Sequence, residues 1–304
     1  MLSYKTVQIA TDEEFKALTS LTKTEFEELL KGFTNVWEDS FQTPGTPHRG
    51  RPAKLLGSGD KLVFILFYLK NYPLQEVLGF LFDLDQSQAN RWIKVLSVVL
   101  REALKRGGYL PAREAQQLEE ELAKLPPSDL ILDGTERRRQ RPKDPDAQKL
   151  FYSGKKKAHS VKNLVIVNDE SQRIEYLSPT VEGKKHDKKL AEESQLTLPA
   201  TATVIKDKGF EGYEVPGGAC HYQPQKKPRG GELSPLQKTI NSVIAGVRIV
   251  VEHVIAGIKR CRIVKDIFRN TMEQFDDLVM EIACGLHNFR VTFRKPNEVT
   301  KIAG

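Results

Sequence analysis

Apolar side chains recur at helical spacing in the first part of the chain. Phe26, Leu29 and Phe33 lie on one face of a predicted helix, because residues three, four and seven positions apart return to the same side. Thr22 and Glu25 precede this face with the spacing of a capping box, in which each side chain accepts a hydrogen bond from the other residue's backbone amide. These positions predict a helix that begins near Thr22.

Three more helical patterns follow a turn-rich, basic stretch of Pro, Gly, His and Arg. They span residues 60–71, 73–82 and 86–105, and residues 83–85 form the short connection between the second and the third. Pro73 suits the first turn of its helix, where the missing amide proton is not needed. Two helices joined by a tight turn after a supporting helix are typical of a helix-turn-helix domain.

The third helix of this group carries polar side chains near its start. Gln88, Asn90, Arg91 and Lys94 are of the types that read base edges in the major groove. We therefore predict that they contact DNA. The alternative is a helical protein-interaction module, because three-helix packing is common.

After Pro126-Pro127 the pattern changes from helical to strand-like, which indicates a second domain. We expect five strands, at about 129–136, 160–167, 173–179, 202–206 and 219–223. A helix at 187–195 precedes the fourth strand, and two long helices follow the fifth, the last at 272–293. This order predicts an α/β domain with helices packed on a mixed five-stranded sheet. Residues 136–157 show no pattern and are expected to be an irregular insertion.

Three acidic residues stand at informative places in these elements. Asp133 ends the first predicted strand and Asp207 ends the fourth. If those strands are adjacent and parallel, the two carboxylates meet at one edge of the sheet, and Glu252 can approach them from the helix above. Each acid alone is more often a turn former or a solvated residue. Together they predict a site for hard divalent cations, of which Mg²⁺ fits best because it keeps waters and phosphate oxygens as further ligands.

The helix that carries Glu252 is otherwise mostly apolar. A helix turns by roughly 100° per residue, so Arg248, Glu252 and Lys259 share one stripe. One interpretation is an amphipathic helix with a salt-bridged polar edge. The other is that Glu252 holds a metal ion while Arg248 and Lys259 bind phosphates of DNA.

Composition narrows the class of protein. The 304 residues are 39% hydrophobic and 29% charged, with a net charge of +7, which favours a polyanionic partner. The three cysteines have no zinc spacing. No apolar run approaches the length that crosses a bilayer and no secretory signal opens the chain, so we expect a soluble, intracellular protein with no membrane partner. Four basic clusters are expected to track DNA: Arg137, Arg138, Arg139 and Arg141; Lys155–Lys157; Lys184 and Lys185 with Lys188 and Lys189; and Lys226 and Lys227 with Arg229.

The combined motifs resemble those of DDE-class insertion-sequence transposases over essentially the whole chain. The Arg248, Glu252 and Lys259 spacing matches the late-helix motif of that family, although Ala245 stands where the family has Tyr. The segment from Gly183 to His186-Asp187 also has a counterpart in these proteins. We interpret Asp187 mainly as the N-cap of the following helix, and it is the rival candidate for the second acid.

This resemblance implies a ribonuclease-H-like catalytic domain after an all-α helix-turn-helix domain. Asp133, Asp207 and Glu252 would hold two Mg²⁺ ions, for which Mn²⁺ is expected to substitute, and would cleave and join double-stranded DNA at terminal inverted repeats and a target site. A homodimer on DNA and a cytoplasmic location at the bacterial nucleoid are expected. The alternatives are a DNA-binding regulator or domesticated derivative without transposition, and a ribonuclease-H-like nuclease without strand transfer. The expected divisions are an N-terminal helical segment 1–42, a basic linker 43–58, a helix-turn-helix domain 59–125, a catalytic domain 128–296 and a tail 297–304.

Overall fold

The computed structural model describes residues 1–41, 54–217, 220–228 and 230–294, so most of the predicted linker, Arg229 of the basic clusters and the predicted tail lie outside the described residues. The chain forms two compact units. The helical unit contains Met1–Leu110, Ile258–Asp266 and Asn270–Phe293, and the sheet unit contains Pro111–Gly257 and Ile267–Arg269. The last helix, which we expected in the catalytic domain, thus belongs to the helical unit.

The helical unit confirms the predicted helices and adds two at the N-terminus. Its elements are α1 (Tyr4–Gln8), α2 (Asp12–Thr19), α3 (Lys23–Phe41), α4 (Ser58–Asn71), α5 (Gln75–Phe82), α6 (Gln86–Arg106), the 3₁₀ turn η2 (Arg262–Val264) and α11 (Phe275–Arg294). The capping box before α3 is present: the Thr22 amide donates to Glu25 at 2.7 Å, and the Glu25 amide donates to Thr22 Oγ1 at 3.1 Å. Pro73 lies before α5 and not in its first turn, so that detail of the prediction is wrong.

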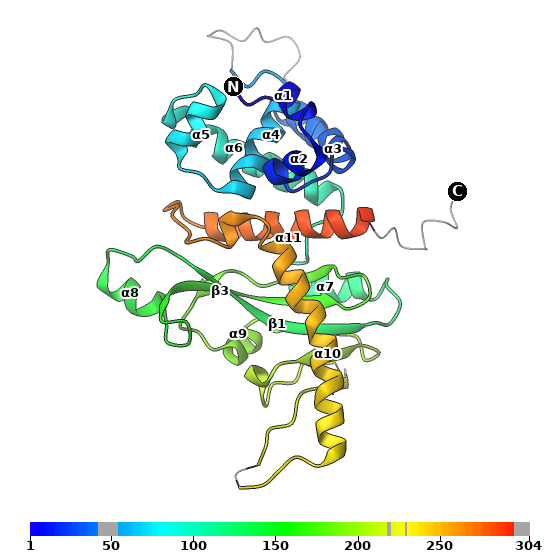
Figure 1. The fold of residues 1–304 in the computed structure, drawn as a ribbon. Helices are drawn as coiled ribbons and strands as arrows, with labels where there is room; N and C mark the ends of the chain where they lie inside the picture. The colour runs from blue at the N-terminus through cyan, green and yellow to red at the C-terminus, as the bar shows by residue number, and fades with distance from the viewer. Residues whose placement is uncertain (42–53, 218–219, 229, 295–304) are drawn as a thin grey trace. The chain divides into compact units, whose positions relative to one another are not determined.

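The predicted helix-turn-helix consists of α4, α5 and α6 (Figure 1). α5 ends at Phe82, and its C-cap Asp83 is in the left-handed conformation. Asp85 then caps α6, because its side chain accepts a 2.7 Å hydrogen bond from the Gln88 amide. The turn is close to α5: a Cβ on Gly79 would lie 2.6 Å from the Leu84 carbonyl oxygen. Only glycine fits at this point, which is how the turn stays short.

The sheet unit is built on one mixed sheet with the strand order β2-β3-β1-β6-β7, in which β4 and β5 also pair with β3. β1 is antiparallel to β3 and parallel to β6, and β6 is parallel to β7. The strands are β1 (Asp129–Arg138), β2 (Tyr152–Ser153), β3 (Ala158–Asn168), β4 (Ile174–Leu177), β5 (Val181–Glu182), β6 (Thr203–Lys206) and β7 (Cys220–Tyr222). All five predicted strands are present, with β2 and β5 as short additions. This mixed sheet with flanking helices, after a helical domain, is the ribonuclease-H-like α/β architecture.

The stretch after the first acid is more regular than we predicted. β1 continues to Arg138, and α8 (Pro145–Phe151) follows before β2. Asp144 caps α8 by accepting a 2.7 Å hydrogen bond from the Ala147 amide. The expectation of an irregular insertion at 136–157 is therefore wrong, because its helix is too short to show a clear apolar period.

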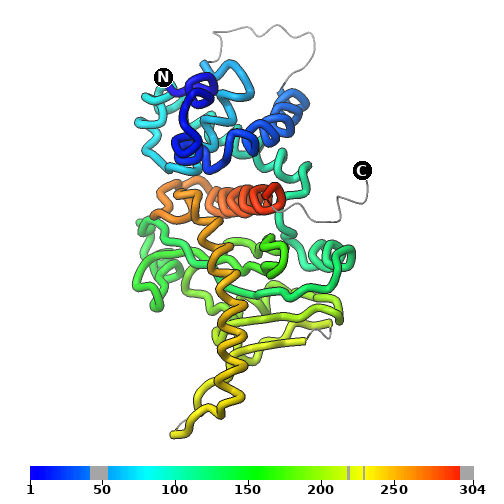
Figure 2. Tube along the Cα trace, turned by 45° about the vertical axis from the view of Figure 1, so that its right-hand side comes forward, coloured from blue at the N-terminus to red at the C-terminus, as the bar shows by residue number. Residues whose placement is uncertain are grey.

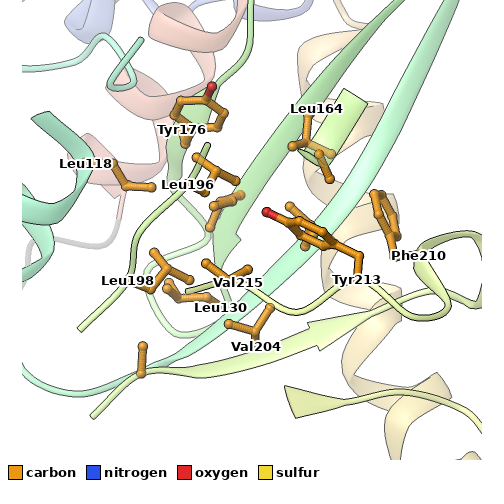
Figure 3. Packing of buried hydrophobic residues seen from close by; sticks show 14 of the residues in the cluster. Leu118, Leu130, Leu164, Tyr176, Leu196, Leu198, Val204, Phe210, Tyr213 and Val215 are labelled. Carbon is orange, nitrogen blue, oxygen red and sulfur yellow. The ribbon is translucent and has the colours of Figure 1, made fainter. Parts of the chain in front are cut away.

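One face of the sheet carries the main core of this unit. α7 (Ala115–Leu122) and α9 (Asp187–Glu193) contribute to it together with the loops after α9 and β6. Figure 3 shows Leu130 of β1, Leu164 of β3 and Val204 of β6 packed with Tyr213 and Val215. Since side chains alternate along a strand, the neighbouring residues of β1 and β6 point to the opposite face.

α10 (Pro235–Ile258) crosses the sheet in both views (Figures 1 and 2). Ile244, Val251 and Val254 are buried, whereas Leu236 and Val243 are more than half exposed. Among the described helices, α10 is the one long and apolar enough to span a membrane by length and composition. Our expectation that no apolar run approaches this length is thus wrong. The observation is weak evidence for a membrane, since core helices of soluble proteins pass the same test.

Candidate active site

Two of the predicted acids occupy equivalent positions on neighbouring strands. β1 and β6 are parallel, and their last paired residues are Leu132 and Lys206. Asp133 and Asp207 follow directly, so the predicted meeting of these two positions at one place in the sheet is confirmed. Asp133 does not end its strand as we expected, because β1 continues along β3. It marks instead the point where β6 leaves β1.

The two carboxylates lie on the face of the sheet that α10 covers. Leu132 and Val204 belong to the core on the other face, and side chains alternate along each strand. Asp133 and Asp207 therefore point away from that core. An ion pair agrees with this: Arg248 Nη1 of α10 lies 3.3 Å from Asp207 Oδ1.

Asp133 is the most perturbed carboxyl of the site. Its pKa is raised from 3.8 to about 6, first of all because burial disfavours the charged form. The negative charges of Asp207 and Asp187 raise it further, whereas a hydrogen bond from the Gly134 amide (2.8 Å) and the positive charge of Arg248 lower it. A cation bound beside this carboxyl would stabilise its ionised form. Carboxyl groups with perturbed pKa values are frequent at functional sites.

The contacts of the Asp207 carboxylate with the protein are made by one of its two oxygens. Its Oδ1 accepts a 2.6 Å hydrogen bond from the Lys208 amide at the start of the 3₁₀ turn η1 (Lys208–Phe210) and also faces Arg248. Gln223 Nε2 donates to the Asp207 carbonyl oxygen at 2.8 Å. The side chain is 39% exposed. Its other carboxylate oxygen is therefore available to a ligand that approaches from solvent.

Arg248 is only partly used by this ion pair. Its side chain is 22% exposed, and its Nε is buried without a hydrogen-bond partner. The interpretation in which Arg248 pairs with Glu252 is wrong: the partner in the structure is Asp207. A guanidinium has five N–H donors in a planar fork, so this side chain retains donors that suit a phosphate.

Glu252 lies one turn beyond Arg248 on α10, exposed and with no hydrogen bond or ion pair among the described residues. Within these residues, no group of three or more His, Cys, Asp and Glu side chains is placed to share a metal ion. The structure thus brings Asp133 and Asp207 together but does not add Glu252 to them. α10 ends at Ile258, so Lys259 follows the helix and does not continue its stripe, contrary to our prediction.

Asp187 approaches the same place from the other side of the sheet. It is the first residue of α9, and His186 holds the cap position, so its predicted N-cap role is wrong. Its Oδ1 lies 3.1 Å from Lys162 Nζ and 3.1 Å from where a Cβ on Gly134 would be. The buried Lys162 was missed from sequence; a lysine shortly before the apolar run of β3 was the available signal.

Some side chains of the predicted basic track are exposed to solvent, and others are buried or bound to neighbouring protein groups. Arg137 is buried and donates to Asn163 Oδ1 (2.8 Å) and Thr180 Oγ1 (3.1 Å), so the prediction that it contacts DNA is wrong. Arg138 and Lys184 are exposed. The Arg139 guanidinium stacks 4.0 Å from the centroid of the Phe151 ring, and Lys185 pairs with Glu193 at 2.8 Å.

The recognition-helix residues belong to the helical unit. Arg91 and Lys94 are exposed on α6, and Asn90 is partly exposed beside them. Gln88 Oε1 accepts a 3.1 Å hydrogen bond from the Asp85 amide, so this side chain closes the capping box of α6. Asn90, Arg91 and Lys94 remain as one polar face.

The sheet-unit site fits a divalent cation by its chemistry. Asp133 and Asp207 supply carboxylate oxygens, the ligands that Mg²⁺ and Mn²⁺ prefer. Burial and the neighbouring acids raise the pKa of Asp133, and a bound cation would offset both effects.

The chain matches two protein families. The family described as DDE superfamily endonuclease matches residues 132–288, just over half of the chain. The family described as helix-turn-helix of DDE superfamily endonuclease matches residues 53–106. The chain therefore belongs to the DDE superfamily endonucleases, which generally use divalent metal ions, and its helix-turn-helix implies DNA binding.

The chain is also similar to the probable transposase for insertion sequence element IS702 from Microchaete diplosiphon. The two are 28% identical over 247 residues, which cover 81% of this chain and 84% of that protein. No solved structure shows significant similarity to this chain. The resemblance to DDE-class insertion-sequence transposases that the motifs indicated is thereby confirmed.

Proposed function

We propose that this protein is a transposase that binds the terminal inverted repeats of its own insertion sequence, cleaves the ends by phosphodiester hydrolysis, and joins the freed 3′-hydroxyls to target DNA. The observation that carries the proposal is the placement of Asp133 and Asp207 at equivalent positions of two parallel strands beneath Arg248. Family membership supplies the class of reaction.

The carboxylates of Asp133 and Asp207 are proposed to hold the metal, with Glu252 as the third ligand. Two Mg²⁺ ions bound there would lower the pKa of an attacking water or 3′-hydroxyl and stabilise the leaving 3′ oxygen. Mn²⁺ has the same ligand preference and is expected to substitute. Glu252 is one helical turn from Arg248, on the same side of α10, and its exposed side chain is free to turn.

Arg248 is proposed to change partner when DNA binds. In the DNA-free protein it offsets the charge of Asp207 at 3.3 Å. A DNA phosphate offers the same guanidinium two acceptor oxygens, including one for the buried Nε that lacks a partner. Moving to the phosphate would free Asp207 for the metal. DNA binding and metal binding would then strengthen each other.

Asp207 is preferred to Asp187 as the second acid because of the faces of the sheet. Asp207 shares the face of Asp133 and Arg248, whereas Asp187 is on α9, which packs on the opposite face and binds Lys162. We propose that Asp187 orients Lys162 and supports the backbone at Gly134.

The remaining contacts with DNA are proposed from charge. Asn90, Arg91 and Lys94 of α6 would read the terminal repeat. The exposed Arg138 and Lys184 would bind phosphates directly, whereas Arg139 and Lys185 would first have to leave Phe151 and Glu193. Lys259 is proposed as a further phosphate contact. Since two ends must be joined, a homodimer on double-stranded DNA is expected. These partners imply a soluble protein that acts at the bacterial nucleoid in the cytoplasm.

The test is cleavage of a labelled duplex carrying the terminal repeat, in the presence of Mg²⁺. Asp133→Asn and Asp207→Asn should each abolish cleavage while the duplex still binds. Asp187→Asn should reduce cleavage without abolishing it. If Asp207→Asn cuts at the normal rate and Asp187→Asn does not cut, the second acid is Asp187. Asp146→Asn is the matched control, because Asp146 is exposed on α8 and, among the described residues, its ion pair is with Lys149.

The products distinguish this proposal from its alternatives. A transposase forms joined products with target DNA as well as cut ends. Cut ends without joined products would indicate a ribonuclease-H-like nuclease, and binding without either would indicate a regulator that has lost the reaction.

A further inference from the structure

A compact basic segment follows α10 and belongs to the helical unit. Among residues 259–265, Cys261, Ile263 and Val264 are buried, whereas Arg260 and Arg262 are exposed. The apolar residues hold the 3₁₀ turn η2 against α4. The arginines between them therefore face solvent at a fixed place beside α4.

The last turn of α4 brings a further cation to this place. Lys70 is partly buried, and burial is the largest cause that lowers its pKa. The positive charges of Arg260, Arg290 and Arg262 each lower it further, opposed by the thiol of Cys261. The three arginines therefore lie within electrostatic range of Lys70, in agreement with the contact between α4 and η2.

Within the described residues, Lys70 and Arg260 lack the acidic partners that other cations of the same unit have. Elsewhere in the helical unit Arg101 pairs with Glu281 at 2.6 Å and Lys31 with Glu28 at 2.7 Å. Among the described residues, the side chains of Lys70 and Arg260 make neither an ion pair nor a hydrogen bond. Arg262 has Asp266 at 2.9 Å.

A simpler explanation accounts for only part of this arrangement. A lysine in the last turn of a helix is stabilised by the helix dipole, which explains Lys70 alone. It does not explain why two exposed arginines are fixed beside it. Like charges held together without a counter-charge are unfavourable, and a bound anion would remove that cost.

We propose that Lys70, Arg260 and Arg262 form a site for a phosphate of the DNA backbone, which we call the Lys70 site. It shares no residue with the polar face of α6 or with the acids of the sheet unit. Phosphate contacts fix the position of a protein on a duplex without reading its sequence. The Lys70 site thus anchors DNA while other residues select it. The inference rests on the proposed function in taking DNA as the substrate.

The test is the salt dependence of DNA binding by the full chain. The probe is a fluorescein-labelled duplex of random sequence, because phosphate contacts do not depend on sequence, and binding is followed by anisotropy over a series of NaCl concentrations. Each lost phosphate contact lowers the slope of log K against log[salt] by about 0.9. Lys70→Ala/Arg260→Ala should therefore lower the slope by about 2, so that the affinity ratio between roughly 50 and 200 mM salt shrinks about tenfold.

The control removes the same charge elsewhere in the unit. Lys31→Ala/Arg106→Ala also deletes two cations, but each has acidic partners in the free protein, so its slope should stay close to that of the wild type. Equal slopes for the wild type and the Lys70/Arg260 variant would overturn the inference about the Lys70 site and leave the proposed function standing. A wild-type chain that binds no duplex at all would contradict the proposed function as well.

Thermal unfolding separates a binding defect from a folding defect. Because Lys70 and Arg260 repel one another, their removal should leave the melting temperature unchanged or raise it. Inorganic phosphate at constant ionic strength should raise the melting temperature of the wild type more than that of the variant. A variant that melts lower and responds equally to phosphate would show a purely structural role and overturn the proposal.

Discussion

Replacing Asp133 by Asn should stabilise the metal-free protein while abolishing cleavage. Burial raises the pKa of Asp133 from 3.8 to about 6. The folded state therefore holds the proton more tightly than the unfolded state, and stability falls as the pH rises from about 4 to about 6. A difference of about 2 pKa units corresponds to about 3 kcal/mol at pH 8. Asn carries no charge at any of these pH values, and its amide oxygen can still accept the Gly134 hydrogen bond.

The assay is urea unfolding in EDTA, at pH values from 4 to 8, of the wild type and the Asp133→Asn variant. We expect a gain of about 1–3 kcal/mol for the variant at pH 8, which falls to roughly 0.5 kcal/mol at pH 4, where Asp133 is protonated in the folded wild type and partly protonated in the unfolded wild type. Asp146→Asn, which changes an exposed carboxyl, should show no such pH dependence. If Asp133→Asn is equal to or less stable than the wild type at pH 8, Asp133 does not carry a costly buried charge and our account of the site is wrong.

Three further changes test other parts of the structure. Arg248→Ala should tighten Mn²⁺ binding in the absence of DNA by about tenfold, ~1.4 kcal/mol, because a nearby positive charge is lost; isothermal titration would show weaker or equal binding if Arg248 only orients its partner. Gly134→Ala should cost about 1–2 kcal/mol in thermal unfolding, since its Cβ would lie 3.1 Å from Asp187 Oδ1, and an unchanged melting temperature would refute that close packing. Arg101→Met should cost about 3 kcal/mol in urea, because Glu281, 6% exposed in its side chain, loses its partner; a loss below 1 kcal/mol would show that the pair is not structural.

The periodic elements could be predicted from the sequence because their signals are local. The capping box of Thr22 and Glu25, the succession α4 to α6 and the five main strands each follow from spacing within a short window. The pairing of β1 with β6 was a condition of the prediction that Asp133 and Asp207 meet, and the structure fulfils it.

What could not be predicted depends on contacts distant in the chain. Nothing local distinguishes Arg137, which is buried against Asn163 and Thr180, from the exposed Arg138 beside it. The role of Asp187 was misjudged because Lys162 meets it only after β3 and α9 pack together. Arg248 pairs with Asp207 and not with Glu252 because of the way α10 crosses the sheet, which the sequence does not show.

The central claim is that the carboxylates of Asp133 and Asp207 bind the same metal centre when DNA is present. The most direct measurement is a Mn²⁺ titration, followed by electron paramagnetic resonance, of the wild type and of Asp133→Asn/Asp207→Asn with a duplex bound. We predict tight Mn²⁺ binding by the wild type and its loss in the double variant, with DNA binding retained. Equal Mn²⁺ binding by both proteins would contradict the account.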